Sequence, residues 1–232
     1  MRIRHNILIT MILLLCSCNK KTEKQKPEQN SESIIIESKS ELKTESELDT
    51  DYSLFAELFA KEVLKENIRT QEFDVTKLEK PNHLLIFKSD GLEKIVAYSS
   101  KNYPQKSEPN YYEHFILFVA TFDNQKNAKN TFDRIKSDSK YGLMEWNGLE
   151  KELSERVRSL NVGAKSGGMI TQIGKQVFSL VETCRETPIG GTWKDYENKF
   201  IGFITKNEEE IEVLNSHCGM DRYKIEKIKA SR

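Results

Sequence analysis

Phe115-Ile116-Leu117-Phe118-Val119-Ala120-Thr121-Phe122 is the stretch of sequence that decides the fold of this chain. Every residue in it except Thr121 is apolar, and a near-continuous apolar run of this length is typical of a buried central strand. We therefore expect a sheet that has residues 115–122 in its interior.

The sequence after this strand predicts two helices. Asp123 can cap the first helix, because its side chain can accept a hydrogen bond from a free backbone N–H of the first turn. The glycine-containing segment 163–168 ends the second helix. The apolar residues recur at helical spacing, and they are Ala128, Phe132 and Ile135 in the first helix and Leu149, Leu153, Val157 and Leu160 in the second.

A β-hairpin is predicted next. Residues 169–173 and 176–183 are β-prone, and Gly174-Lys175 separates them as a two-residue turn with glycine first. Side chains alternate between the faces of a strand, so two sets of residues are expected on opposite faces. These sets are Val177, Ser179, Val181 and Thr183 on one face, and Phe178, Leu180, Glu182 and Cys184 on the other.

The C-terminal part predicts one further helix and a less defined ending. Thr192 and Asp195 match a capping box after the turn at 188–191. The apolar stripe of that helix consists of Trp193, Tyr196, Phe200 and Ile204. Residues 208–214 and 223–228 are expected to form a last helix or a strand pair.

The region before the central strand predicts a helix and a hairpin. Apolar residues from Leu54 to Val63 recur at helical spacing, so an amphipathic helix is expected to begin at Asp51 or Tyr52. His83 to Lys88 and Leu92 to Tyr98 are expected to be strands, because the Asp90-Gly91 pair between them is a common hairpin turn.

This order of elements predicts an α+β fold. We expect one domain over residues 52–232, made of an antiparallel sheet with helices packed on one face, in a ferredoxin-like layer arrangement or one close to it.

The first eighteen residues have the features of an export signal. Arg2 and Arg4 precede an apolar run from Ile7 to Leu15, and the run ends at Leu15-Cys16-Ser17-Cys18. These last four residues resemble the lipobox of bacterial lipoproteins, which has a Leu three positions before the lipidated Cys and a small residue directly before it. Cys18 fits this pattern, whereas Cys16 follows Leu15 and does not.

The resemblance implies a signal peptide over residues 1–17, lipidation of Cys18, and a place in the bacterial cell envelope with the lipid as membrane anchor. The apolar run is far shorter than the ~20 residues that a spanning helix needs. A short uncleaved anchor or a buried core helix is the alternative.

Residues 18–51 are expected to be a disordered tether. From Asn19 to Asp51 the chain consists mainly of Lys, Glu, Ser, Gln and Thr, and it contains neither an aromatic residue nor glycine. Such a segment buries too little apolar surface to offset the entropy of ordering. As a flexible coil of about 33 residues it would span roughly 30 Å.

The charge of the chain gives no indication of nucleic-acid binding. The 36 Lys and Arg include Arg2 and Arg4, so cleavage leaves 34 basic residues against 36 Asp and Glu. A phosphate-binding protein needs a surplus of basic residues on some face, and here the two signs alternate along the sequence.

Two cysteines remain in the folded part, Cys184 and Cys218. In an exported protein they are expected to form a disulfide, which would contribute about 2–4 kcal/mol. Two alternatives stay open. His217 beside Cys218 could join Cys184 in a zinc site, although no C-x-x-C spacing supports a metal. A Cys/His nucleophile pair is the other.

The remaining local motifs predict neither a cofactor nor a metal. Gly190-Gly191-Thr192 could bind a phosphate at a helix start, but a turn followed by an N-cap explains it as well. Glu208-Glu209-Glu210 could hold a cation, but it lacks the glycine and spacing of a calcium loop, and a solvated first helical turn is expected there.

Three tyrosines are the candidate contact residues for a partner. Tyr103, Tyr111 and Tyr112 lie in or beside a loop with two prolines, directly before the central strand. Exposed rings at such a place can stack on a sugar or anchor a protein, whereas the alternative is that they cover the edge of the core.

Two classes of function follow from the sequence. The first is a lipid-anchored, non-catalytic binding or assembly protein that contacts another envelope protein or a small ligand. The second is a small hydrolase-like envelope enzyme whose catalytic residues are scattered in the sequence, although no G-x-S-x-G is present after the signal. A cleft lined by groups such as His114, Glu182 and Asp195 would favour the enzyme.

Overall fold

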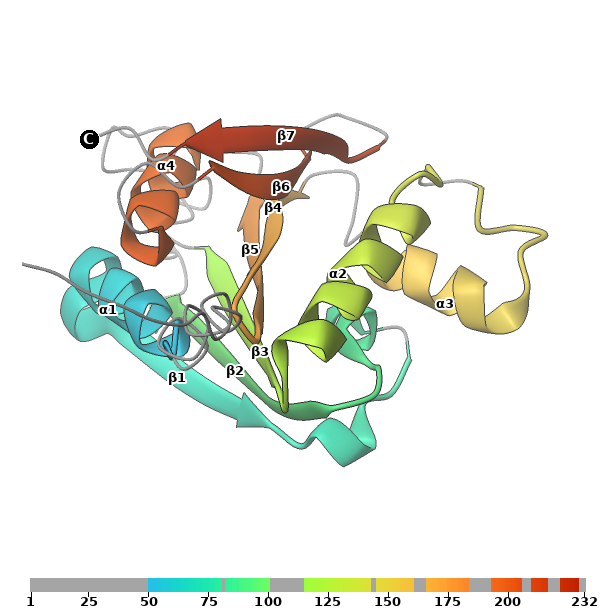
Figure 1. Cartoon of the computed structure of the whole chain (residues 1–232), viewed down its shortest axis with the longest axis horizontal. Coiled ribbons are helices and arrows are strands. Elements are labelled where there is room, and N and C mark those ends of the chain that lie inside the picture. The colour runs from blue at the N-terminus through green and yellow to red at the C-terminus, as the bar shows by residue number, and fades with distance from the viewer. Residues whose placement is uncertain are drawn as a thin grey trace, which may run out of the picture. The chain divides into compact units, whose positions relative to one another are not determined.

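The computed structural model describes residues 50–80, 82–100, 115–142, 145–160, 166–183, 193–205, 210–216 and 222–229, all within one compact unit of residues 43–232. In this part of the chain the strands form one antiparallel sheet in the order β1-β2-β3-β5-β4-β6-β7 (Figure 1). The strands are β1 (Ile68–Phe73), β2 (Leu92–Ser100), β3 (Ile116–Phe122), β4 (Ser166–Ile173), β5 (Gln176–Thr183), β6 (Glu210–Ser216) and β7 (Lys224–Lys229). The helices are α1 (Ser53–Leu64), α2 (Gln125–Asp138), α3 (Lys151–Leu160) and α4 (Trp193–Ile204), with short 3-10 helices at Lys65–Asn67, Val75–Lys77 and His83–Phe87.

The apolar run 115–122 forms β3, the third strand from the β1 edge. Its side chains alternate between two hydrophobic clusters. Leu117 and Val119 belong to one, and Phe118, Ala120 and Phe122 belong to the other. The prediction of a buried strand in the interior of the sheet is confirmed.

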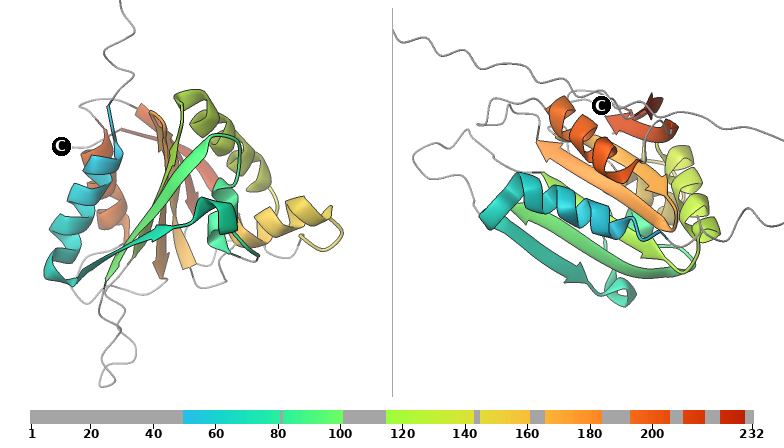
Figure 2. Two further views of the ribbon diagram at one scale, coloured as in Figure 1. Left: turned by 90° about the horizontal axis from the view of Figure 1, so that it is seen from below. Right: turned by 60° about the vertical axis from the view of Figure 1, so that its left-hand side comes forward.

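The α+β class and the antiparallel sheet are confirmed, but the helices cover both faces of the sheet instead of one (Figure 2). α1 and α4 pack against the face of Leu117 and Val119. α2 packs against the opposite face together with the 3-10 helix His83–Phe87, and α3 packs against α2 and this 3-10 helix, with Leu160 in the same cluster.

The connections between strands explain why the helices lie on opposite faces. β3 and β4 are both antiparallel to β5, so they are parallel to each other, and the crossover between them contains α2 and α3. β5 and β6 are likewise parallel across β4, and their crossover contains α4. Both crossovers advance in the same direction along the sheet but start from antiparallel strands, so right-handed connections place their helices on opposite faces. A ferredoxin-like order would instead return β6 beside β3, with all crossover helices on one face.

The strand predicted for His83 to Lys88 is wrong, because residues 83–87 form a 3-10 helix. The Asn82 side chain accepts a hydrogen bond from the Leu84 N–H at 3.1 Å and thereby caps this helix. Leu84 to Phe87 are all buried. Four consecutive buried residues are compatible with a short helix inside the core as well as with a buried strand. Asp90-Gly91 therefore connects this helix to β2 and is not a hairpin turn.

For the C-terminal region, the strand pair is confirmed and the helix alternative is wrong. β6 and β7 pair in antiparallel register, from Glu210 opposite Lys229 to Asn215 opposite Lys224. Glu210 therefore begins a strand and does not belong to a helical turn, whereas Glu208 and Glu209 lie outside the described residues. Ile211 and Val213 alternate with more polar residues, which is the spacing of a strand.

The other predicted elements are present with small shifts. The Gly174-Lys175 hairpin and the two faces of β5 are confirmed, and Gly174 has a φ of 55°. The first turn of α2 is capped by Asn124 and not by Asp123, since Asn124 Oδ1 accepts from the Asn127 N–H at 2.9 Å.

Candidate functional site

At one end of the sheet lie the strand ends that flank, in sequence, most of the residues that the sequence singled out. Ser99, Ile116, Val181, Gly168 and Ser216 form one row across five neighbouring strands. The segments 101–114, 184–192 and 217–221 leave or rejoin the described strands directly beyond this row. We call it the Thr183 end, and we call the opposite end, which carries the β4–β5 turn, the Gly174 end.

The predicted contact and disulfide residues belong to these segments and lie outside the described residues. They are Tyr103, Tyr111, Tyr112, Cys184 and Cys218, as well as His114. Cys18 lies outside the described residues too. The topology therefore brings together the strand ends that precede and follow these segments, and the roles of these residues stay predictions.

The strand ends set a condition on the predicted disulfide. Thr183 and Ser216 precede the two cysteines closely, and they end β5 and β6, which have β4 between them. Two strand spacings amount to roughly 10 Å, whereas bridged cysteines have Cα atoms within about 7 Å. A disulfide between Cys184 and Cys218 therefore requires the two segments to converge beyond the sheet.

Two buried carboxyl groups lie near the Thr183 end, on the face that α1 and α4 cover. Glu182 of β5 is 4% exposed and Glu197 of α4 is 3% exposed. Glu182 points to this face because it alternates in register with Phe178 and Leu180, which pack into the same cluster. Glu197 is one turn before Phe200 and Ile201, so it lies on the buried side of α4.

Asn215 of β6 completes this group, which we call the Glu182 cluster (Glu182, Glu197 and Asn215). Asn215 is fully buried, and its Nδ2 donates to Glu197 Oε2 and to Glu226 Oε2, both at 3.4 Å. Among the described residues no group donates a hydrogen bond to Glu182 Oε1 or to Asn215 Oδ1. Buried polar atoms without a partner are rare, and each calls for an explanation.

The electrostatics of the Glu182 cluster favour a proton on Glu182. Burial, and secondly the nearby charge of Glu197, raise the pKa of Glu182 to about 9, with Lys194 opposing them. Lys194 forms an ion pair with Glu197 at 3.3 Å, and its side chain is 47% exposed. The group therefore combines a protonated carboxyl, an ion-paired carboxylate and an amide, with a lysine at the solvent side.

Sequence reasoning named only one member of this group. It named Glu182 as a residue that could line a cleft, but it named Asp195 with it, and Asp195 is exposed on α4. Glu197 and Asn215 were missed. The available signal for Glu197 was its position in the apolar stripe of a helix, between Trp193 and Phe200.

A serine and a histidine also pair in the structure, but in the core. His83 Nδ1 lies 3.0 Å from the Ser159 carbonyl and must donate to it, so Nε2 accepts from the Ser179 hydroxyl at 2.9 Å. Ser179 is 1% exposed, and the His83 ring packs 5.2 Å from the Phe118 ring. Burial lowers the pKa of His83 to about 4. Because both ring nitrogens of His83 are engaged by Ser159 and Ser179, we interpret the pair as a core contact.

A cleft of about 670 Å³ lies on the α2 and α3 side, between α3 and the segment 78–90. Its size suits a small ligand. The buried Leu78 and Leu85 line it, and Lys80 and Glu155 form an ion pair at 2.5 Å across it. Arg156 and Glu152, which also line the cleft, form a second ion pair at 3.0 Å.

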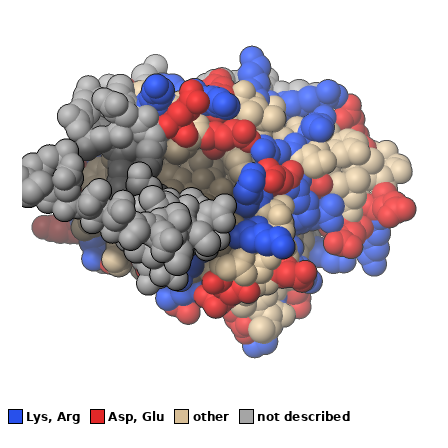
Figure 3. Space-filling view, viewed as in Figure 1, with Lys and Arg blue, Asp and Glu red and all other residues tan. Residues whose placement is uncertain are grey.

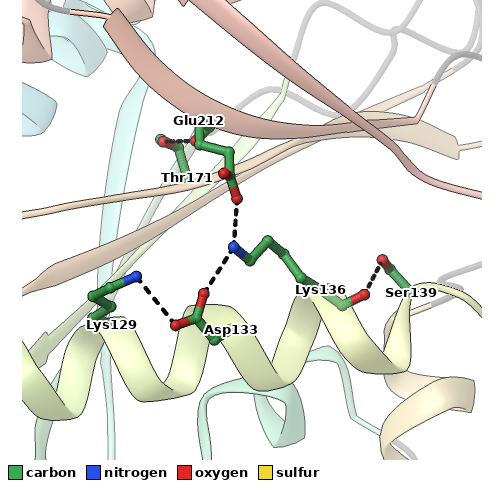
Figure 4. A network of polar contacts seen from close by, with 6 residues as sticks. All are labelled: Lys129, Asp133, Lys136, Ser139, Thr171 and Glu212. Atoms are coloured by element: carbon green, nitrogen blue, oxygen red, sulfur yellow. Dashed lines mark hydrogen bonds and ion pairs between the residues drawn. The ribbon is translucent and has the colours of Figure 1, made fainter.

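A network of ion pairs ties α2 to β6 (Figure 4). Lys136 Nζ lies 2.7 Å from Asp133 and 2.5 Å from Glu212, and Lys129 contacts Asp133 at 3.2 Å. These groups flank a shallow groove of about 390 Å³. Because the cations and carboxylates are paired, we interpret the network as structural.

The surface carries both signs of charge, and Lys/Arg and Asp/Glu are interspersed over the described face in Figure 3. Within the described ranges no three His, Cys, Asp or Glu side chains lie close enough together to hold a metal ion. None of the described helices has the length and apolar character needed to cross a bilayer.

Comparisons with protein-family models, with curated proteins and with solved structures find no match to this chain. The site must therefore be interpreted from its own chemistry.

Proposed function

We propose that this chain is a lipid-anchored bacterial envelope protein whose domain binds another envelope protein or a small ligand at the Thr183 end. The lipobox-like sequence at Leu15 to Cys18 supports the anchor. Lipid chains on one Cys hold a protein on a bilayer without a spanning helix.

The observation that carries this proposal is the place where the N-terminal chain joins the domain. Gln176 Nε2 donates to Asp51 Oδ1 at 3.0 Å, and the Tyr52 ring lies against Gly174. The chain therefore enters at the Gly174 end. The eight residues of β5 separate this point from the Thr183 end by about 26 Å.

A domain held at the Gly174 end presents its Thr183 end away from the point of attachment. At that end β2 stops and β3 begins, on either side of the segment that contains Tyr103, Tyr111 and Tyr112, and the Glu182 cluster lies beside it. Loops on a rigid sheet are the usual place for binding residues, and tyrosine rings supply large contact areas. A tether of about 33 residues would give the domain the reach to meet a partner.

The test is capture of a partner from the envelope. The native lipoprotein is extracted in mild detergent and used as bait, beside a variant with Tyr103, Tyr111 and Tyr112 all changed to Ala. We expect a specific partner with the wild type and its loss with the variant. Lys126→Ala, at the Gly174 end, serves as control and should retain the partner.

An envelope enzyme is the second candidate, and the electrostatic influence of Glu197 on the buried Glu182 favours it. One protonated and one ionised carboxyl group are what general acid and base catalysis uses. Turnover of an envelope substrate by the purified protein, abolished in both Glu182→Gln and Glu197→Gln, would establish this function in place of binding.

A further inference from the structure

We propose that the Glu182 cluster is a binding site for a primary ammonium group, carried by the ligand or partner that the Thr183 end binds. This inference rests on the proposed binding function for its biological role. It names the chemistry that this end of the domain recognises.

The first argument is the kind of atom left without a partner. Glu182 Oε1 and Asn215 Oδ1 are both acceptors, and their residues are 4% and 0% exposed. A complementary group must therefore donate several hydrogen bonds. An ammonium group has three N–H donors, and carboxyl and amide oxygens are acceptors of the kind that it binds.

The second argument is that Glu197 connects the members of the cluster. It accepts from Asn215 Nδ2 at 3.4 Å, and its charge acts on Glu182. β4 lies between β5 and β6, and there Gly167 stands opposite Glu182 and Met169 opposite Asn215. Gly167 carries no side chain, so β4 places none directly opposite Glu182 on this face.

The third argument is that an ammonium group from the solvent side already reaches this cluster. Lys194 Nζ lies 3.3 Å from Glu197 Oε2, and about half of the Lys194 side chain is exposed, whereas that of Glu197 is 4% exposed. A half-exposed ammonium group on the first turn of α4 is thus already paired with the buried carboxylate. A ligand ammonium can approach from the same side.

A divalent metal ion fits the group less well. Hard cations take six or more oxygen ligands, or keep several waters, and rely on closely grouped carboxylates. In the described part of the chain no three such side chains come together. The carboxyl oxygens of Glu182 and Glu197 and the amide oxygen of Asn215 are better suited to an ammonium group.

Binding an ammonium group has a measurable consequence for protons. Burial raises the pKa of Glu182 to about 9, so its carboxyl group is protonated at pH 7. An ammonium group favours the carboxylate form, so a cation enters and the Glu182 proton leaves to the solvent. At pH 7 the exchange should release up to about one proton per bound ammonium.

The test uses the full chain in non-ionic detergent and two probe salts. Propylammonium chloride has three N–H donors, and tetramethylammonium chloride has the same charge and none. Titration calorimetry in two buffers of different ionisation enthalpy gives affinity and proton release together. We expect propylammonium to bind with release of a proton and tetramethylammonium not to bind.

Matched variants locate the site. Glu182→Gln should weaken propylammonium binding at least about tenfold and abolish proton release, because one charge-assisted hydrogen bond is lost. Glu210→Gln removes an exposed carboxylate at the Gly174 end and should bind like the wild type. Absence of propylammonium binding by the wild type would overturn the proposal, as would equal binding of both salts or an unchanged affinity in Glu182→Gln.

This outcome is separable from that of the proposed function. If the tyrosine-dependent partner is captured but propylammonium does not bind, the ammonium site is wrong and the binding function stands. If propylammonium binds as expected but no partner depends on the tyrosines, the site stands and the proposed function is wrong.

Discussion

Glu182 of β5 and Glu197 of α4 approach each other inside the domain, and the charge of Glu197 adds to burial in raising the pKa of Glu182 to about 9. Neither residue is at an exposed surface, and a sheet strand and a crossover helix position them independently. Burying two acidic groups together is costly unless one is neutral or a cation is present. The domain therefore retains a group that costs stability, which is typical of a functional site.

Replacing Glu182 by Gln is expected to change how stability depends on pH. The pKa of Glu182 is raised from 4.5 to about 9, so the folded state keeps a proton that the unfolded state releases over this range. The stabilising contribution is complete below pH 4.5 and is lost as the pH rises toward 9. At pH 8 Glu182→Gln should be more stable than the wild type by about 2 kcal/mol or more. Denaturant unfolding at pH 4, 6 and 8 measures this difference.

Glu210→Gln is the control for this prediction, because Glu210 is exposed. Its effect on the free energy of unfolding should stay within about 0.5 kcal/mol at each pH. If the free energy of unfolding changes equally with pH in Glu182→Gln and in the wild type from pH 4 to 8, Glu182 does not carry the proton.

His83 should produce a loss of stability in acid. Its pKa is lowered from 6.5 to about 4, so between these pH values the unfolded state binds a proton that the folded state excludes. The free energy of unfolding should fall by about 3 kcal/mol as the pH drops from 6.5 to 4. Gln cannot titrate, so in His83→Gln the free energy of unfolding should fall less steeply between pH 6.5 and 4. At pH 7 this variant should be less stable than the wild type. An equally steep limb in the variant would assign the loss to other groups.

Gly91→Ala should destabilise the junction between β2 and α2. Gly91 has a φ of 75°, and a Cβ there would lie 2.2 Å from Asp123 Oδ1. The Asp123 N–H also donates to the Gly91 carbonyl at 2.8 Å, so a shift would disturb the start of α2. We expect a loss of about 2–4 kcal/mol in the free energy of unfolding, measured with denaturant.

Gly148→Ala separates the cost of a positive φ from the cost of the contact with Asp123. Gly148 has a φ of 100° but nothing within 4 Å of a Cβ, so only the backbone conformation is penalised. Its loss should be about 1 kcal/mol. Equal losses at Gly91 and Gly148 would mean that contact with Asp123 is unimportant.

Local patterns were sufficient to predict the regular elements of the sheet. The apolar run 115–122, the Gly174-Lys175 turn and the stripe of Ala128, Phe132 and Ile135 carry their structure in residue spacing, and all three are confirmed. The strand prediction for residues 83–87 was wrong because β-prone side chains are also found in a buried 3-10 helix. The Asn82 side chain caps this helix and so favours it over a strand.

The arrangement of helices and the Glu182 cluster depend on long-range pairing. α4 lies beside α1 and not beside α2 because β6 pairs with β4. This pairing joins residues far apart in the sequence, so no short stretch of sequence predicts it. Glu182, Glu197 and Asn215 are up to 33 positions apart, and only the completed sheet brings their strands and helix together. Glu197 was detectable only as a charge in an apolar stripe.

Cys18→Ser should abolish lipid anchoring. The acyl chains supply the hydrophobic burial that holds the protein on the bilayer, so the variant should lose incorporation of labelled palmitate and leave the membrane fraction or stay unprocessed. Cys16→Ser is the matched control and should be labelled and fractionate like the wild type. Acyl label retained in Cys18→Ser would place the lipid elsewhere.

The most direct test of the account is site-specific photo-crosslinking in the living cell, with a crosslinking residue at position 112 for the Thr183 end and at position 126 for the Gly174 end. Both proteins keep Cys18 and their tether, so they differ only in which end carries the probe. We predict a discrete crosslinked partner from position 112 that is absent from position 126. The same partner from both positions, or from position 126 alone, would contradict the claim that the domain is attached at one end and binds at the other.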